Sequence, residues 1–172
     1  MKIERTNYYY DVNKLKIEVF KFKKYFNEIN QLNVKYDRTR NIETLPHLNC
    51  IGKSPKDISE WNFDNVSPIF ENSHMLSTVS QIKETTHRIR LMAMKPKSCY
   101  SLHIDTYKRL HWAIITHPSC HMSFQESDEK VFSGFHIPAD GYGYMVDTRM
   151  MHTALNPWDQ FRYHLVIDII DS

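Results

Sequence analysis

Three residues in the second half of the chain, His103, Asp105 and His152, are of the types that hold a catalytic metal ion. The triplet His103-Ile104-Asp105 puts an imidazole and a carboxylate at positions i and i+2, which point to the same face of a strand. Two imidazoles and one carboxylate on one face of an octahedron suit Fe(II) and leave the opposite face open for oxygen. The pattern predicts an iron site, although a histidine beside an acid is also common on protein surfaces.

Arg162 is the residue most suited to bind an acidic ligand near such a site. It lies ten positions after His152, in a segment that alternates strictly between two faces. One of these faces carries Arg162, His164, Val166 and Asp168. If the strand is central, this face lines a barrel interior, where a buried guanidinium needs an anionic partner. An arginine fork can meet a carboxylate with two parallel hydrogen bonds. If the strand is peripheral, the same face lies in water.

Arg109 and His111 form a second candidate pair. They are two positions apart at the start of the strand expected after the His-x-Asp triplet, so they share a face. Both could point toward an acidic ligand. A histidine at such a position can equally be a packed strand residue, and the residues alone leave both roles open.

The elements that must position these residues are short strands. Eight segments rich in apolar, β-branched and aromatic residues predict strands at Arg88–Met94, Cys99–His103, His111–Thr116, His121–Gln125, Val131–Ile137, Tyr142–Val146, Met151–Leu155 and Phe161–Ile170. Turn sequences separate them, most clearly at 138–141 and 156–159. Regular short strands favour a sandwich or barrel over a βαβ fold. Eight strands match a double-sheet jelly roll of the cupin kind.

The first half of the chain is predicted to be helical and irregular. Apolar residues at Leu15, Val19 and Phe22 follow helical steps and predict an amphipathic helix over residues 12–30. Ser73 is a candidate cap for a second helix over residues 74–85. Prolines and polar residues predict loops and short elements over 37–70. We expect one domain over residues 1–172, a mainly β (α+β) fold in which the helices of 1–87 pack on a jelly-roll core at 88–170.

Composition excludes several classes of protein. With 172 residues, 41% of them hydrophobic and 13% aromatic, the chain can bury a core. A net charge of +2 is too small to indicate nucleic acid. The first residues lack the apolar core of a signal peptide, and no apolar run reaches the roughly 18 residues that span a bilayer. The odd number of cysteines, three, suggests reduced thiols. We therefore expect a soluble, cytoplasmic protein.

Four short motifs, which follow one another along the second half of the chain, give it a family resemblance. It resembles the aspartyl/asparaginyl β-hydroxylase-like branch of the 2-oxoglutarate/Fe(II) oxygenases over roughly residues 88–170. The motifs are His103-Ile104-Asp105, Arg109-Leu110-His111, the segment 152–157 and the segment 162–168. The resemblance implies a double-stranded β-helix that uses Fe(II), 2-oxoglutarate and dioxygen. It also implies a hydroxylase of a free amino acid or of a peptidyl Asp or Asn, with release of succinate and carbon dioxide.

The resemblance assigns roles to six residues. It implies that His103, Asp105 and His152 bind the iron and that Arg162 pairs with the far carboxylate of 2-oxoglutarate. It further implies that His111 assists in holding this cosubstrate and that Arg109 faces either cosubstrate or substrate. Animal aspartyl hydroxylases have glycine in place of the metal carboxylate, so Asp105 brings the chain closer to small bacterial or phage-like members. A serine that helps to bind cosubstrate in some members has no clear counterpart near Met92.

Other interpretations of the same residues remain open. A cupin-type metal protein would keep the His-Asp-His set without 2-oxoglutarate chemistry and give Arg162 a structural role. A zinc site could be built from Cys99, His103, Cys120 and His121. The chain could also be an inactive module on an oxygenase fold. Five aromatic residues could line a substrate mouth or simply pack: Tyr100, Tyr107, Trp112, Tyr144 and Trp158.

Overall fold

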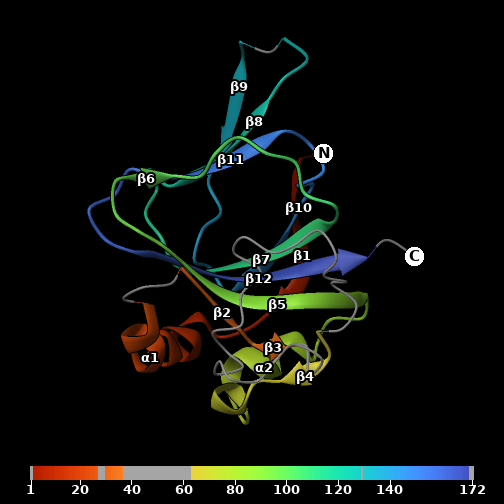
Figure 1. Ribbon diagram of the computed structural model, residues 1–172, viewed down its shortest axis with the longest axis vertical. Helices are drawn as coiled ribbons and strands as arrows, with labels where there is room; N and C mark the ends of the chain where they lie inside the picture. The colour runs from red at the N-terminus through yellow and green to blue at the C-terminus, as the bar shows by residue number, and fades with distance from the viewer. Residues whose placement is uncertain (1, 27–29, 37–62, 129, 171–172) are drawn as a thin grey trace.

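The computed structural model describes residues 2–26, 30–36, 63–128 and 130–170. In these ranges two antiparallel sheets lie face to face (Figure 1). The six-stranded sheet has the spatial order β1 (Ile3–Tyr9), β10 (Tyr142–Val146), β7 (Lys108–Ile115), β12 (Arg162–Ile170), β5 (Thr85–Met94) and β2 (Gln31–Asn33). The four-stranded sheet has the order β6 (Ser98–Cys99), β11 (His152–Asn156), β8 (His121–Gln125) and β9 (Phe132–Phe135). A small separate sheet pairs β3 (Lys35–Tyr36) with β4 (Asn65–Val66).

From β5 onward the chain passes back and forth between the two sheets. Strands β5, β7, β10 and β12 lie in the larger sheet, and β6, β8, β9 and β11 lie in the smaller one. This order is that of a jelly roll, and all eight predicted strands are present. Their ends differ most at the second strand, which covers only Ser98–Cys99 rather than 99–103. His103 lies beyond it and joins the sheet through an isolated bridge to His152.

Strands β1 and β2 were not predicted. They extend the larger sheet at its two edges, where β1 pairs with β10 and β2 pairs with β5. Strand β1 is rich in polar residues and half-exposed, and β2 has three residues. Neither therefore carries the apolar alternation from which a strand is recognised in a sequence.

The two predicted helices are present but shorter than expected. Helix α1 covers Val12–Phe22 and continues as a 3-10 turn over Lys23–Phe26, while residues 27–29 lie outside the described ranges. Helix α2 covers His74–Val79 and is capped by Ser73, whose side chain accepts a bond from the backbone N–H of Leu76. It ends at Val79 rather than at 85, and Thr85 already belongs to β5, which pairs with β12.

The predicted loop region is described only in part. Residues 37–62 lie outside the described ranges, and Pro68–Phe70 forms a short 3-10 helix. No helix of the described residues has both the length and the apolar character needed to cross a membrane.

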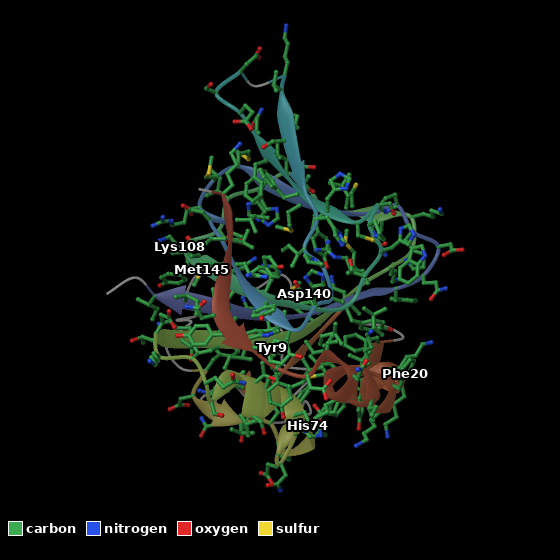
Figure 2. The ribbon with its side chains drawn as sticks, turned by 180° about the vertical axis from the view of Figure 1, so that it is seen from behind. Tyr9, Phe20, His74, Lys108, Asp140 and Met145 are labelled. Atoms are coloured by element: carbon green, nitrogen blue, oxygen red, sulfur yellow. The ribbon has the colours of Figure 1, made fainter. Side chains whose placement is uncertain are left out.

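The core has two layers, one on each face of the larger sheet. Leu15, Val19 and Phe22 of α1 belong to the outer layer, which joins both helices to the sheet. The inner layer lies between the two sheets and consists of Met94, Ala113, Met122, Phe124, Ile137, Val146 and Ala154. Figure 2 shows side chains with nitrogen atoms in this space between the sheets as well. The inner layer therefore shares its space with polar groups.

The central strand β12 supplies residues to both layers. Tyr163, Leu165 and Ile167 belong to the outer layer. Arg162 and His164 point the opposite way, into the space between the sheets, because successive residues of a strand alternate in direction. Strand β12 lies between β5 and β7, so the face that carries Arg162 lies in the interior.

Glu18 is a buried charge that joins the two helices. It is 5% exposed on the inner side of α1, and its carboxylate accepts hydrogen bonds from the backbone N–H groups of His74 (2.5 Å) and Met75 (2.9 Å). Both N–H groups begin α2, where no intrahelical acceptor is available. His74 is labelled in Figure 2, close to α1. Glu18 therefore caps one helix from the other.

We predict that Glu18→Ala lowers the free energy of unfolding by about 1.5–3 kcal/mol, the value of hydrogen bonds to a charged group. Urea denaturation followed by circular dichroism measures this change. Lys14→Ala, on the exposed side of the same helix, is the matched control and should leave the midpoint unchanged. Equal midpoints for the two variants would show that Glu18 does not act as a cap.

Candidate metal centre

The structure brings His103, Asp105 and His152 together. Oδ2 of Asp105 lies 3.4 Å from Nε2 of His152 and 3.8 Å from Nε2 of His103. One potential ligand atom from each residue lies within 4.8 Å of the others, and no other such group of histidine, cysteine or acidic side chains occurs in the described ranges. The bridge between His103 and His152 causes this convergence, because it sets the two imidazoles on neighbouring backbones.

Backbone carbonyls orient both imidazoles. Nδ1 of His103 lies 2.7 Å from the carbonyl oxygen of Ser101, and Nδ1 of His152 lies 2.8 Å from that of Met150. A carbonyl only accepts hydrogen bonds, so each Nδ1 carries the proton and each Nε2 keeps its lone pair. An N–H held in this way is the usual support of a metal-binding histidine. With the Asp105 carboxylate, the three residues fit a divalent ion bound by two nitrogens and one oxygen.

The site has a buried side and an open side. The side chain of His152 is 2% exposed, whereas that of His103 is 35% exposed. Burial by itself raises the pKa of Asp105, but His152, Arg109 and His103 outweigh this effect and hold the pKa below its ordinary value. Asp105 is therefore ionised at neutral pH, as a metal ligand must be.

A chain of ion pairs supports Asp105 from behind. Its Oδ2 atom lies 2.5 Å from Nη1 of Arg109. Nε of Arg109 lies 2.8 Å from Oδ1 of Asp168, which also pairs with Nη2 of Arg90 at 2.5 Å. Asp168 and Arg90 are 1% and 3% exposed. Arg109 was predicted to face cosubstrate or substrate; it lines the pocket, but both of its charged contacts are with these two aspartates.

Sequence reasoning missed the roles of Arg90 and Asp168. Each is a charged residue within a long apolar strand, which was an available signal of a buried charge. The pairing itself depends on register, because β12 and β7 place Asp168 directly opposite Arg109.

A pocket of about 500 Å³, its open mouth included, leads from the candidate metal ligands into the space between the sheets. It is lined by Met92, Met94, Tyr100, His103, Arg109, His111, Met122, Thr148, His152, Ala154, Arg162, His164 and Val166. Three methionines make much of its wall apolar. Five of the six residues predicted for the site, all but Asp105, line this pocket, and Asp105 contacts three of them.

Arg162 is a buried cation in this pocket. It is 5% exposed, and burial lowers its pKa to about 10, so it stays charged at neutral pH. Its Nε donates to Nε2 of His164 at 2.9 Å. Among the described residues no ion pair includes Arg162. A guanidinium buried without a counter-ion is unfavourable unless a ligand supplies one.

His111 lies beside this cation. It is 7% exposed, and its Nδ1 lies 3.4 Å from Nδ1 of His164. Its Nε2 has no hydrogen-bond partner among the described residues. Burial and the nearby Arg162 hold the pKa of His111 well below the ordinary histidine value. The pocket thus contains an uncompensated guanidinium and an unpaired imidazole nitrogen.

Of the five aromatic residues considered for the mouth, Tyr100 lines the pocket. Its hydroxyl is buried without a hydrogen-bond partner among the described residues, and burial raises its pKa. The other four pack elsewhere. Trp112 is in the outer core and donates to the carbonyl of Gly141, Trp158 stacks on His117, Tyr107 stacks on His87, and Tyr144 donates to Asp140.

The zinc alternative finds no support in the geometry. His103 lies with Asp105 and His152, and no group of three or more metal-binding side chains in the described ranges includes a cysteine. Cys120 is buried, and its thiol donates a hydrogen bond to the side-chain oxygen of Asn156. Cys99 is exposed. Both are free thiols.

No protein-family model matches the chain, and no curated protein matches it. Solved structures match it in fold. The match to a Pseudomonas putida prolyl-4-hydroxylase covers 99% of this chain and 93% of the hydroxylase chain, with a TM-score of 0.56 and 8% sequence identity. The viral collagen prolyl hydroxylase from Paramecium Bursaria Chlorella virus-1, solved as its 2OG complex, matches 98% of this chain and 96% of its own, with a TM-score of 0.52 and 10% identity.

EvdMO1 also matches 99% of this chain, with a TM-score of 0.52 and 12% identity, but this chain covers only 47% of it. For three further structures the chain covers 48%, 25% and 54% of their length. At these identities the matches show the fold alone. The structures with TM-scores above 0.5 therefore show a shared fold, and that fold is the jelly roll that the sequence predicted. None of the structures named here is described as an aspartyl or asparaginyl hydroxylase.

Proposed function

We propose that this chain is a single-domain dioxygenase, dependent on 2-oxoglutarate and Fe(II), that hydroxylates an unactivated C–H bond and releases succinate and carbon dioxide. One observation carries the proposal: a group of two histidines and one carboxylate opens into the same pocket as an uncompensated, buried guanidinium. The first part suits Fe(II), and the second suits a dicarboxylate that extends from the metal toward Arg162. The fold shared with prolyl hydroxylases supports this class.

Each part of the pocket has a function in this scheme. His103, Asp105 and His152 hold Fe(II), which when bound supplies the activation of dioxygen. The ion pair with Arg109 keeps the Asp105 carboxylate in place. Arg162 and His111 bind the far carboxylate of 2-oxoglutarate.

The apolar wall of the pocket also contributes to cosubstrate binding. Met92, Met94 and Met122 exclude water from the space between the metal ligands and Arg162. Charged contacts are stronger where water is excluded, so the same wall strengthens the hold on the cosubstrate.

We further propose that the chain is related to the aspartyl/asparaginyl β-hydroxylase-like branch. Its substrate would then be a free amino acid, or an Asp or Asn residue in a peptide, in the cytoplasm. The order of the four sequence motifs supports this finer assignment. Asp105 supports a small member of the branch that retains the metal carboxylate.

The proposal predicts substrate-dependent turnover. With Fe(II), ascorbate and 2-oxoglutarate, at least one member of a panel of free amino acids and short Asp or Asn peptides should accelerate succinate release. Succinate is measured by mass spectrometry, together with a product heavier by one oxygen. If no panel member accelerates the reaction, the substrate class is wrong. If no succinate forms under any condition, the chain is an inactive module on this fold.

We predict that His103→Ala and His152→Ala each weaken Fe(II) binding by more than about 100-fold, beyond the 10–100-fold typical of groups that only support a metal ligand. Anaerobic calorimetric titration with Fe(II) or Mn(II) measures binding without turnover. His117→Ala, which removes an exposed histidine outside the pocket, is the matched control and should bind metal as the unmodified chain does. Unchanged metal affinity in both test variants would exclude this site.

We predict that Arg162→Ala raises the 2-oxoglutarate requirement at least about 30-fold, because truncating one partner of a buried charge pair costs 2–5 kcal/mol. Arg162→Lys keeps the charge but loses the fork, so its defect should be intermediate. The KM for 2-oxoglutarate and its direct binding to the Mn(II)-loaded protein are the measurements. An unchanged requirement in Arg162→Ala would favour the alternative, a cupin-type metal protein in which Arg162 is structural.

A further inference from the structure

His164 is a buried histidine to which the proposed chemistry gives no role. It lies on the central strand β12 and is 4% exposed in the wall of the pocket. Its two ring nitrogens contact two different groups. Nε2 lies 2.9 Å from Nε of Arg162, and Nδ1 lies 3.4 Å from Nδ1 of His111. His164 therefore connects the two residues that are proposed to hold the cosubstrate.

The proton positions on His164 and His111 follow from the donor character of Arg162. A guanidinium donates and never accepts, so Nε2 of His164 must be the unprotonated, accepting nitrogen. A neutral imidazole carries one proton, which in His164 then lies on Nδ1. That N–H faces Nδ1 of His111, which must accept it. His111 therefore carries its own proton on Nε2.

Both imidazoles are neutral in this arrangement. Burial is the main reason that the pKa values of His111 and His164 lie well below the ordinary value, and the charge of Arg162 acts in the same direction. A second proton on His111 would set two N–H groups against each other between the Nδ1 atoms. A second proton on His164 would lie on Nε2 and oppose the N–H of Arg162. The geometry and the electrostatics thus favour the same pair of tautomers.

We infer that His164 is a positioning residue for both neighbours. It fixes His111 as an Nε2–H donor, and it holds the guanidinium of Arg162 through the Nε atom. The two terminal amino groups of Arg162 are thereby left for a ligand. The inference rests on the proposed function for the identity of that ligand. Nε2 of His111 has no partner among the described residues, and it belongs to a pocket-lining side chain. The free polar groups of His111 and Arg162 at this end of the pocket are then donors only.

The donors of His111 and Arg162 favour a ligand end that offers acceptors. A carboxylate offers acceptor oxygens alone, whereas the corresponding amide brings an NH₂ group that would face an N–H of His111 or Arg162. Polar groups left unpaired in a buried site oppose binding strongly. The chain of contacts from Arg162 through His164 to His111, here called the relay, therefore predicts that the pocket prefers 2-oxoglutarate over its 5-amide, 2-oxoglutaramate. This preference adds to the one that the charge of the carboxylate causes.

The test combines a direct view of the proton with a binding measurement. In metal-free protein, long-range ¹H–¹⁵N spectra report which ring nitrogen of His111 is protonated, with the signals assigned by their loss in His111→Gln. We expect the Nε2–H tautomer in the unmodified chain and a mixture of tautomers in His164→Leu. Tyr163→Phe, the adjacent residue on the opposite face of β12, is the control and should keep the tautomer.

For the same variants, the affinity of the Mn(II)-loaded protein for 2-oxoglutarate and 2-oxoglutaramate is measured. His164→Leu should weaken the binding of 2-oxoglutarate about 10-fold, the value of about one lost hydrogen bond, and should reduce the preference for 2-oxoglutarate over the amide. His164→Gln, which can still accept from Arg162, should recover part of the affinity.

The outcomes separate this inference from the proposed function. An Nδ1–H tautomer of His111 in the unmodified chain overturns the relay even if 2-oxoglutarate is turned over. A loss of affinity in His164→Leu without a change of tautomer, or with an unchanged preference over the amide, indicates a structural role only and also overturns it. The tautomer measurement needs neither metal nor turnover, so it stands if the proposed function fails.

Discussion

The central position of strand β12 is the constraint on which the rest of the structure depends. It is hydrogen-bonded to β5 on one side and β7 on the other, and eight of its nine residues are buried. A strand buried on both faces must satisfy whatever polar groups it carries within the protein or with a ligand. Its outer face is apolar and joins the helices, while its inner face carries Arg162, His164 and Asp168. The pocket exists because this charged face is turned inward.

The buried charges on that face are satisfied in two different ways. Asp168 pairs with Arg90 and Arg109, and Arg109 pairs in turn with Asp105, so this group is balanced by the protein itself. Arg162 has a neutral imidazole beside it and no anionic partner among the described residues. Both groups lie in the same interior, and the contrast between them is the basis for proposing a structural function for the first and a ligand-binding function for Arg162.

The candidate metal ligands and the proposed cosubstrate pocket have one feature in common, which is that a neighbouring group sets the tautomer of each histidine. In His103 and His152, a backbone carbonyl takes the Nδ1 proton and leaves Nε2 as an acceptor toward the metal. In His111, by the inference above, the N–H of His164 donates to Nδ1 and Nε2 is left as a donor. The same residue type is thus directed to opposite tasks by the group that contacts its second nitrogen.

The sequence by itself determined the segments that form the jelly-roll strands and the face that Arg162 shares with His164, because alternation and turns are local properties. The His-x-Asp pair lies beyond the strand that was predicted to end at His103, and His103 joins the sheet only through its bridge to His152. It did not determine β1 or β2, whose residues become a strand only beside a partner edge. Only the tertiary structure paired Arg109 with Asp168 and set His164 between Arg162 and His111. These contacts depend on the register between strands far apart in the chain, which no local pattern specifies.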